Sequence, residues 1–148
     1  MARRLWLPWV VVFGVAAGGY FIADRHQDRA HGFGDFGLCD RAHQQTCVVD
    51  GDTIRYGGVT IRLEDIDAPE TFSPKCASEA ALGRKATQRL LDLMNAGPFE
   101  VVHDGGRDED IYGRKLRIIE RNGRPVTDTL VAEGLARPWD GARRSWCG

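Results

Sequence analysis

Two short segments rich in β-branched residues are separated by a pair of glycines. TIRY occupies residues 53–56, Gly57 and Gly58 follow, and VTIRLEDI occupies residues 59–66. A two-residue glycine connection between such segments is typical of a tight β-hairpin. The second segment also begins by alternating apolar and polar residues, as a strand with one buried face does. The chain is therefore predicted to fold around an antiparallel hairpin.

The rest of the chain predicts more short strands and two helices. Apolar residues at helical spacing indicate a helix that Gly97 and Pro98 end, and residues 126–134 indicate a second, shorter helix. Short strands with a helix after the third are typical of a small closed barrel of the OB type, so the predicted fold is mainly β with α. The remaining strands or extended segments are predicted at residues 46–49, 99–102, 114–120 and 136–139.

The N-terminal residues form a different kind of segment. Arg3 and Arg4 precede residues 5–23, which carry no charge and as a helix would span about 28 Å, close to the hydrocarbon core of a bilayer. Three interpretations are open: an uncleaved signal-anchor, a cleaved signal peptide and a buried core helix. We favour the anchor. With an anchor or a signal peptide, both arginines stay in the cytoplasm and the rest is exported, either membrane-anchored or secreted.

One domain is expected after this segment. The 148 residues are 43% hydrophobic and 28% charged, as in an ordinary globular protein. Without residues 1–23 the chain loses two arginines and no acid, so its formal charge falls from -1 to -3. Such a domain does not bind polyanions by bulk charge, and nucleic acid would need a local positive site. The predicted division is a signal-anchor or signal peptide at 1–23, a Gly-rich linker at 24–38 and the domain at 39–148.

Four cysteines, Cys39, Cys47, Cys76 and Cys147, are an even number in a domain that we expect to be exported. Two disulfides are therefore predicted, and the absence of a Cys-x-x-Cys pair argues against zinc. Three pairings fit the sequence. We prefer a local Cys39–Cys47 loop with a Cys76–Cys147 bond, which would tie down the C-terminus and stabilise the domain by roughly 3–5 kcal/mol. Free buried thiols are the alternative.

The octad LEDIDAPE at residues 63–70 places four carboxylates at the end of a predicted strand. In the hairpin, Asp52 would lie opposite Leu63, diagonal to Arg62. A straight strand would carry Asp67 roughly 13 Å farther along. We therefore predict that the chain bends after Leu63 and returns Asp67 to Asp52.

Converging carboxylates with backbone carbonyls suit a hard cation such as Ca²⁺, and no His or Cys lies among these acids. Glu70 is a third carboxylate, which would bind through water or act as a base. Arg62 would suit a phosphodiester because a guanidinium presents a planar fork to phosphate oxygens. Asp65 is expected to help from outside the site or to form the turn, and Glu64 to be solvated. A solvated acidic turn is the alternative for the whole cluster.

Four segments of this chain occur in an order and at a spacing that resemble the thermonuclease family, the staphylococcal nuclease homologues. They are VVDGDTIR, IRLEDIDAPE, EDIYGRKL and LVAEGLAR, and the resemblance covers about residues 46–138. It implies a five-stranded OB-type barrel with two helices. It also implies a calcium-dependent endonuclease whose partners are single-stranded or denatured DNA and RNA.

The resemblance assigns metal and proton-transfer roles to the first two of these segments. Asp52 and Asp67 match the two calcium carboxylates, and Ala68 matches a residue whose backbone carbonyl binds the metal. Glu70 matches the carboxylate proposed as general base. A catalytically silent OB-fold module that binds nucleic acid is the alternative function.

The resemblance assigns phosphate contacts to Arg62 and Arg114, and a position near the nucleotide phosphate to Tyr112. Without the resemblance, Tyr112 would pack on the barrel rim and Arg114 would be a surface cation. Ile111 departs from the family, where a lysine precedes the tyrosine. A monomer is expected.

The C-terminal segment ARRSWCG also departs from the family pattern. In the staphylococcal enzyme a long C-terminal helix and base-contacting tyrosines lie here, and we expect ARRSWCG to replace that helix. If Cys147 ties this segment down, Arg143 and Arg144 would supply positive charge near the cleft. A solvated tail is the alternative.

Overall fold

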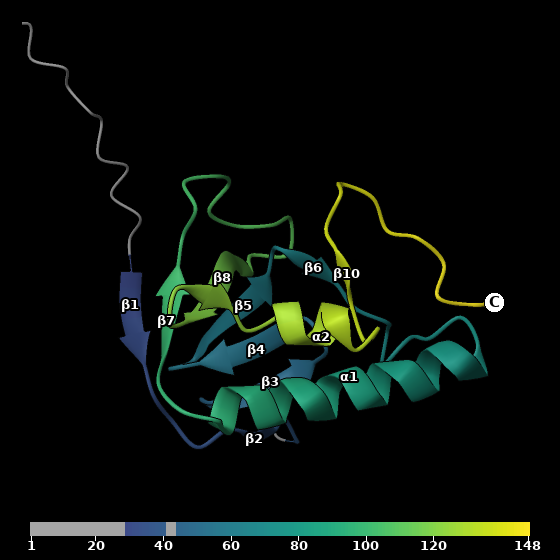
Figure 1. Ribbon diagram of the computed structural model, residues 1–148, viewed down its shortest axis with the longest axis horizontal. Coiled ribbons are helices and arrows are strands. Elements are labelled where there is room, and N and C mark those ends of the chain that lie inside the picture. The colour runs from purple at the N-terminus through teal and green to yellow at the C-terminus, as the bar shows by residue number, and fades with distance from the viewer. Residues whose placement is uncertain (1–28, 41–43) are drawn as a thin grey trace, which may run out of the picture.

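The computed structural model describes residues 29–40 and 44–148 (Figure 1). The segment predicted to be a signal-anchor, residues 5–23, lies outside these ranges. Within them, every helix is too short or too polar to cross a membrane.

The sheet is built around the predicted hairpin. β3 (Cys47–Asp50), β4 (Thr53–Tyr56) and β5 (Val59–Leu63) follow one another as antiparallel neighbours. Gly57 and Gly58 make the turn with φ of 56° and 83°, the left-handed conformation that a two-residue turn needs. The predicted hairpin is confirmed in its position and its turn.

Two later strands extend this sheet into a mixed, curled half-barrel (Figure 1). β8 (Lys115–Arg121) pairs parallel to β5, and β7 (Phe99–Val102) pairs antiparallel to β8. Three more strands complete it: β1 (Arg29–Gly32) on β7, β2 (Gly37–Leu38) on β3 and β9 (Arg124–Pro125) on β8. The predicted count of five strands is therefore not confirmed.

Part of the predicted linker is ordered into this sheet. Residues 29–38 contribute β1 and β2, and Phe36 between them is buried in the core. Phe36 stacks with Tyr56 at 5.9 Å between ring centroids. Backbone pairing and one aromatic side chain therefore hold this part of the predicted linker to the domain.

Two helices are present among the described residues, as predicted. α1 (Ala77–Asn95) begins after Cys76, whose sulfur accepts from the backbone N of Glu79, and it ends before Gly97 and Pro98. α2 is the short helix Asp128–Ala132. α1 packs against β3, and both helices contribute to one core with the strands. Its fully buried members include Val48, Ile54, Leu63, Ile66, Leu90, Met94, Ile119 and Leu130.

Candidate active site

The chain bends after Leu63, as predicted. β5 ends there, and β6 (Ile66–Asp67) begins after two intervening residues. β6 pairs with β10 (Arg137–Pro138) in a separate two-stranded sheet. The Arg62 guanidinium lies inside the bend and donates to the carbonyls of Leu63 and Ile66, the latter at 3.0 Å. A buried arginine therefore fixes the path that leads the chain to Asp67.

Asp65 holds the outer side of the same bend. Its carboxylate accepts from the Thr127 hydroxyl, and its carbonyl accepts from the backbone N of Trp139 at 2.9 Å. Burial raises the pKa of Asp65, and the Thr127 hydrogen bond opposes that rise. Asp65 is therefore a turn-forming residue, one of the two roles predicted for it.

Small residues bring the turn at Asp52 close to the segment that follows β6. A Cβ at Gly51 would lie 2.8 Å from the Cβ of Ala86 and 2.9 Å from the Cβ of Ala68. A Cβ at Gly83 would lie 2.7 Å from the carbonyl oxygen of Glu70. These close approaches need glycine, so the packing of α1 beneath the site sets the positions of the acids.

Three predicted carboxylates converge on one guanidinium, that of Arg143. Its Nη2 lies 3.8 Å from Asp52 Oδ2, its Nε lies 3.6 Å from Asp67 Oδ1, and its Nη1 donates to Glu70 Oε1. Asp52 and Asp67 are both only 4% exposed, whereas Glu70 is half-buried. The structure therefore brings Asp67 back to Asp52, as the predicted bend requires.

The donor set of this cluster fits a hard cation. Asp67 Oδ1 is buried and has no hydrogen-bond partner among the described residues. Burial raises the pKa of Asp67 above its usual value. The hydrogen bond from Trp146 Nε1 at 3.2 Å and the charge of Arg143 lower this pKa, but they do not cancel the effect of burial. Carboxylate oxygens gathered in this way suit Ca²⁺ better than zinc or copper. Ala68 is buried directly after Asp67, and its carbonyl ligand stays a prediction.

Asp50 belongs to the turn beneath the cluster. Its Oδ1 accepts from the backbone N of Asp52 at 3.2 Å. Burial, with the neighbouring charge of Asp52, raises the pKa of Asp50 to about 7. Its place in the turn agrees with the structural role expected for an Asp-Gly pair.

The two predicted phosphate-binding arginines line the same groove, Arg62 from β5 and Arg114 from the turn just before β8. Arg62 Nη2 lies 3.3 Å from Asp52 Oδ2. Arg114 Nη1 donates to Thr53 Oγ1 at 3.3 Å, and Thr53 donates in turn to Asp52 Oδ1 at 2.9 Å. Thr53, which sequence reasoning left without a role, therefore links Arg114 to the carboxylate cluster.

Asp110 organises the turn that carries Tyr112. Its carboxylate accepts from the backbone N of Tyr112 at 2.9 Å and from Arg114 Nε at 2.6 Å. Burial alone would raise the pKa of Asp110, but these hydrogen bonds outweigh it and hold the pKa below its usual value. Tyr112 is 77% exposed, with its ring 5.5 Å from the Arg114 guanidinium carbon. It does not pack into the barrel rim.

An open groove of about 810 Å³ is lined by some of these residues. Its lining includes Arg62, Glu70, Tyr112, Arg114, Trp139 and Arg143. Glu64 also lines it, half-buried and with Oε1 shielded from solvent, so the expectation of a solvated side chain is wrong. Burial raises the pKa of Glu64, and the charge of Asp104 adds to that rise.

Trp139 lines the groove, and the sequence assigned it no role. Its ring centroid lies 5.7 Å from the Arg62 guanidinium carbon, and the side chain is 41% exposed. An aromatic residue at the end of the predicted extended segment 136–139 was the available indication, and it did not say which face the ring would cover.

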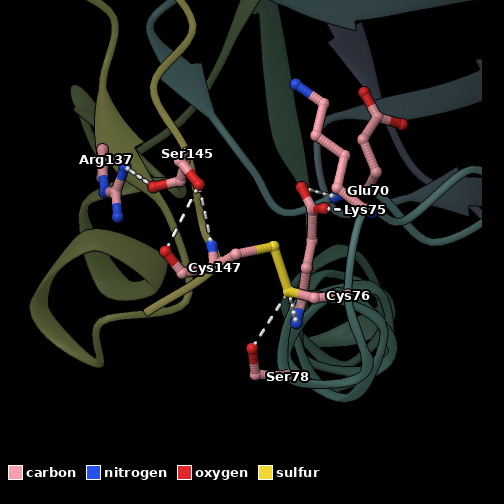
Figure 2. Close-up of a disulfide and its surroundings, with 8 residues drawn as sticks. Glu70, Lys75, Cys76, Ser78, Arg137, Ser145 and Cys147 are labelled. Atoms are coloured by element: carbon pink, nitrogen blue, oxygen red, sulfur yellow. Dashed lines mark hydrogen bonds between the residues drawn. A yellow bond between two sulfur atoms is a disulfide. The ribbon is translucent and has the colours of Figure 1, made fainter.

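Both preferred disulfides are confirmed. Cys39–Cys47 closes a local loop, and Cys76–Cys147 joins the start of α1 to the C-terminal segment (Figure 2). Glu79 lies beside the second bond, but its carboxylate accepts from the backbone N of Lys75 at 2.6 Å. The two sulfurs are bonded to each other and offer no thiolates, so this group is a cross-link and not a zinc site.

Comparison with known proteins identifies similar sequences. A family model described as staphylococcal nuclease homologue matches residues 60–145. In Bacillus subtilis (strain 168), the SPbeta prophage-derived endonuclease YokF is 41% identical over 93 residues, which are 60% of this chain and 31% of that protein. Endonuclease YncB is 39% identical over 93 residues, covering 60% of this chain and 44% of YncB. Endonuclease YhcR is 36% identical over 110 residues, covering 68% of this chain and 8% of YhcR. The chain thus spans less than half the length of each of these relatives.

Proposed function

Because the chain belongs to the staphylococcal nuclease homologue family, we propose that it is a calcium-dependent endonuclease that hydrolyses phosphodiester bonds of DNA and RNA. One observation carries the proposal: the carboxylates of Asp52, Asp67 and Glu70 converge on one cluster, and Glu70 shares a groove with Arg62 and Arg114. Carboxylates for a cation thus lie directly beside the arginines for a phosphate. The endonuclease names of the similar proteins support the same activity.

Asp52, Asp67 and the Ala68 carbonyl are the groups that would hold the ion. When bound, Ca²⁺ supplies positive charge that orients a phosphate and a water and stabilises negative charge in the transition state. The Oδ1 of Asp67, which accepts no hydrogen bond among the described residues, and the hard oxygen donors support this assignment.

The protein's own side chains supply the remaining chemistry. Glu70 accepts the proton of the attacking water, and its half-buried position on the groove gives it access to solvent. Arg62 and Arg114 neutralise charge that develops on the phosphoryl oxygens. Because Asp52 and Thr53 already orient these arginines, little reorganisation is needed when substrate binds.

Tyr112 and Trp139 give the groove two partly exposed aromatic rings, each beside one of the arginines. Aromatic faces of this kind stack on the bases of single-stranded nucleic acid and tolerate any sequence. The substrates that we propose are therefore single-stranded or denatured DNA and RNA.

An exported location agrees with the covalent structure. Two disulfides persist in oxidising compartments such as the periplasm or the cell exterior. The basic start and the uncharged segment 5–23 support export by an anchor or a signal peptide. We propose an exported domain, membrane-anchored if that segment is retained.

The test is cleavage of single-stranded DNA by the full chain with its disulfides formed. We expect cleavage in Ca²⁺, none in chelator, and a loss of about a hundredfold or more in Asp67→Asn. Asp92→Asn, on α1 and hydrogen-bonded to Gln88, is the matched control and should keep full activity. Cleavage that persists in chelator would refute the calcium role. Binding of DNA without cleavage would favour the silent binding module.

A further inference from the structure

Arg143 occupies an unusual position for a residue of a C-terminal segment without regular secondary structure. Each of its three guanidinium nitrogens faces a different carboxylate of the proposed metal cluster. Burial alone would lower the pKa of Arg143. The neighbouring carboxylates, Glu70 first among them, raise this pKa above its usual value. The side chain is nevertheless 46% exposed, so solvent reaches it and the guanidinium can leave without opening the core.

The segment that carries Arg143 is fastened on its C-terminal side. Trp146 packs against the Arg137 guanidinium carbon at 3.7 Å and donates to Asp67, and Arg137 donates to the Ser145 carbonyl at 3.1 Å. The next residue, Cys147, is bonded to Cys76 (Figure 2). The cross-link therefore confines Arg143 to the neighbourhood of the acids.

The adjacent arginine provides a contrast within the same segment. Arg144 is 68% exposed and pairs with Asp140, four residues earlier. It forms no ion pair with Asp52, Asp67 or Glu70. Position, and not the positive charge of the segment alone, sets Arg143 apart.

We propose that Arg143 is a tethered competitor of the metal ion: its guanidinium and a divalent cation use the same carboxylate oxygens, and the Cys76–Cys147 bond keeps the guanidinium at high local concentration. This inference rests on the proposed metal site. A tethered group competes at an effective concentration in the millimolar range for short flexible connections. Arg143 therefore lowers the affinity for Ca²⁺ and compensates the three carboxylates in the metal-free protein.

The first test measures Ca²⁺ binding by isothermal titration calorimetry on the full chain with its disulfides formed. Arg143→Gln should bind Ca²⁺ about tenfold more tightly than wild type. Arg144→Gln removes the same formal charge and should change the dissociation constant by less than about twofold. Equal constants for the two variants, or weaker binding by Arg143→Gln, would refute competition.

A second test changes the tether and leaves every charge in place. In the double variant Cys76→Ser/Cys147→Ser, serine also keeps an oxygen to cap α1. The double variant should bind Ca²⁺ several-fold more tightly than wild type, and adding Arg143→Gln to it should change the affinity little. Releasing the tether also frees Trp146, which donates to Asp67. If the two serine substitutions tighten Ca²⁺ binding as much in the Arg143→Gln variant as in wild type, the effect comes from Trp146 and the inference about Arg143 fails.

Melting temperatures give a readout independent of cleavage. In chelator Arg143→Gln should melt below wild type, because three carboxylates lose their shared cation, and Ca²⁺ should raise its melting temperature more than that of wild type. If no variant binds Ca²⁺, the proposed metal site itself fails. If all bind it with one affinity, only the role of Arg143 fails.

Discussion

The groove has two walls of different construction. The buried wall is Arg62, which lines the groove, together with Asp52 and Asp67 of the adjoining carboxylate cluster. These three residues are between 4% and 7% exposed and continue into the core through the hairpin. The exposed wall, formed by residues 108–114, is a turn on the surface, and Tyr112 on it is 77% exposed. The first is held by packing and by the strand register. The second is held by hydrogen bonds and ion pairs around Asp110.

This difference separates two ways in which a substitution can reduce activity. A change in the buried wall removes a chemical group and also leaves its partner charged and out of water. A change in the exposed wall removes the group alone, because water replaces the lost contact. Stability and activity should therefore fall together on the first wall and separately on the second.

Arg62→Ala should have the largest effect. It removes a proposed phosphate contact, leaves Asp52 without this ion pair and frees the carbonyls of Leu63 and Ile66 at the bend. We expect cleavage to fall by orders of magnitude and the free energy of unfolding to fall by about 3–5 kcal/mol. Urea denaturation in chelator measures the second quantity, and single-stranded DNA cleavage at a temperature where the variant is folded measures the first. Activity within about tenfold of wild type would refute the phosphate role.

Arg114→Ala should reduce cleavage by a similar factor but change stability by less than about 1 kcal/mol. The Arg114 side chain is 25% exposed, and Asp110 keeps its acceptor bonds to the turn backbone without it. The same two measurements apply, with Arg124→Ala as a control on the exposed hairpin end. A stability loss as large as that of Arg62→Ala would erase the distinction between the walls.

Thr53→Val tests the connection between the walls. Valine keeps the volume and removes the hydroxyl that accepts from Arg114 and donates to Asp52. We expect a stability loss of about 1–2 kcal/mol, since Asp52 loses a buried hydrogen bond, and a decrease of about tenfold in cleavage. Thr53→Ser, which keeps the hydroxyl, should recover most of the cleavage. If both variants cleave alike, the hydroxyl does not position Arg114.

The sequence predicted the buried wall better than the exposed one, for a physical reason. The two-glycine turn sets the register, and the structure pairs Thr53 with Arg62 as that register requires. This register makes Asp52 and Arg62 neighbours across the hairpin. The acids that follow Leu63 indicated the bend. These are local patterns, and each is readable within about 20 residues of sequence.

What escaped prediction depends on contacts between distant segments. Thr53 acquires its role from Arg114, 61 residues away. Arg143 was expected near the cleft, but its pairing with Glu70, 73 residues away, was not. The close approach at Gly51 needs Ala86 on α1, which no spacing rule joins to a turn. Strands of two residues, such as β2 and β6, are too short to show a period, so the strand count also escaped prediction.

The smallest effect should come from Asp108, whose ion pairs hold the exposed wall. Lys115 and Arg117 each donate to its carboxylate at 2.6 Å. These two hydrogen bonds, that of Lys115 first, lower the pKa of Asp108 to about 2. Since this pKa lies below the unfolded value, the contribution to stability is present above about pH 4 and is lost as the pH falls towards 2.

Asp108→Asn should therefore melt slightly below wild type at pH 6, and the difference should close as the pH falls towards 2. The difference at pH 6 should also shrink in 0.5 M salt, because the carboxylate is exposed and its pairs are screened. The backbone of Asp108 still accepts from the Leu116 amide at 2.9 Å, so the turn stays attached to β8 in the variant. Melting curves across pH and salt provide the measurement. A difference that persists in salt and in acid would place Asp108 in a packed structure like the buried wall, and the contrast between the two walls would no longer hold at this residue.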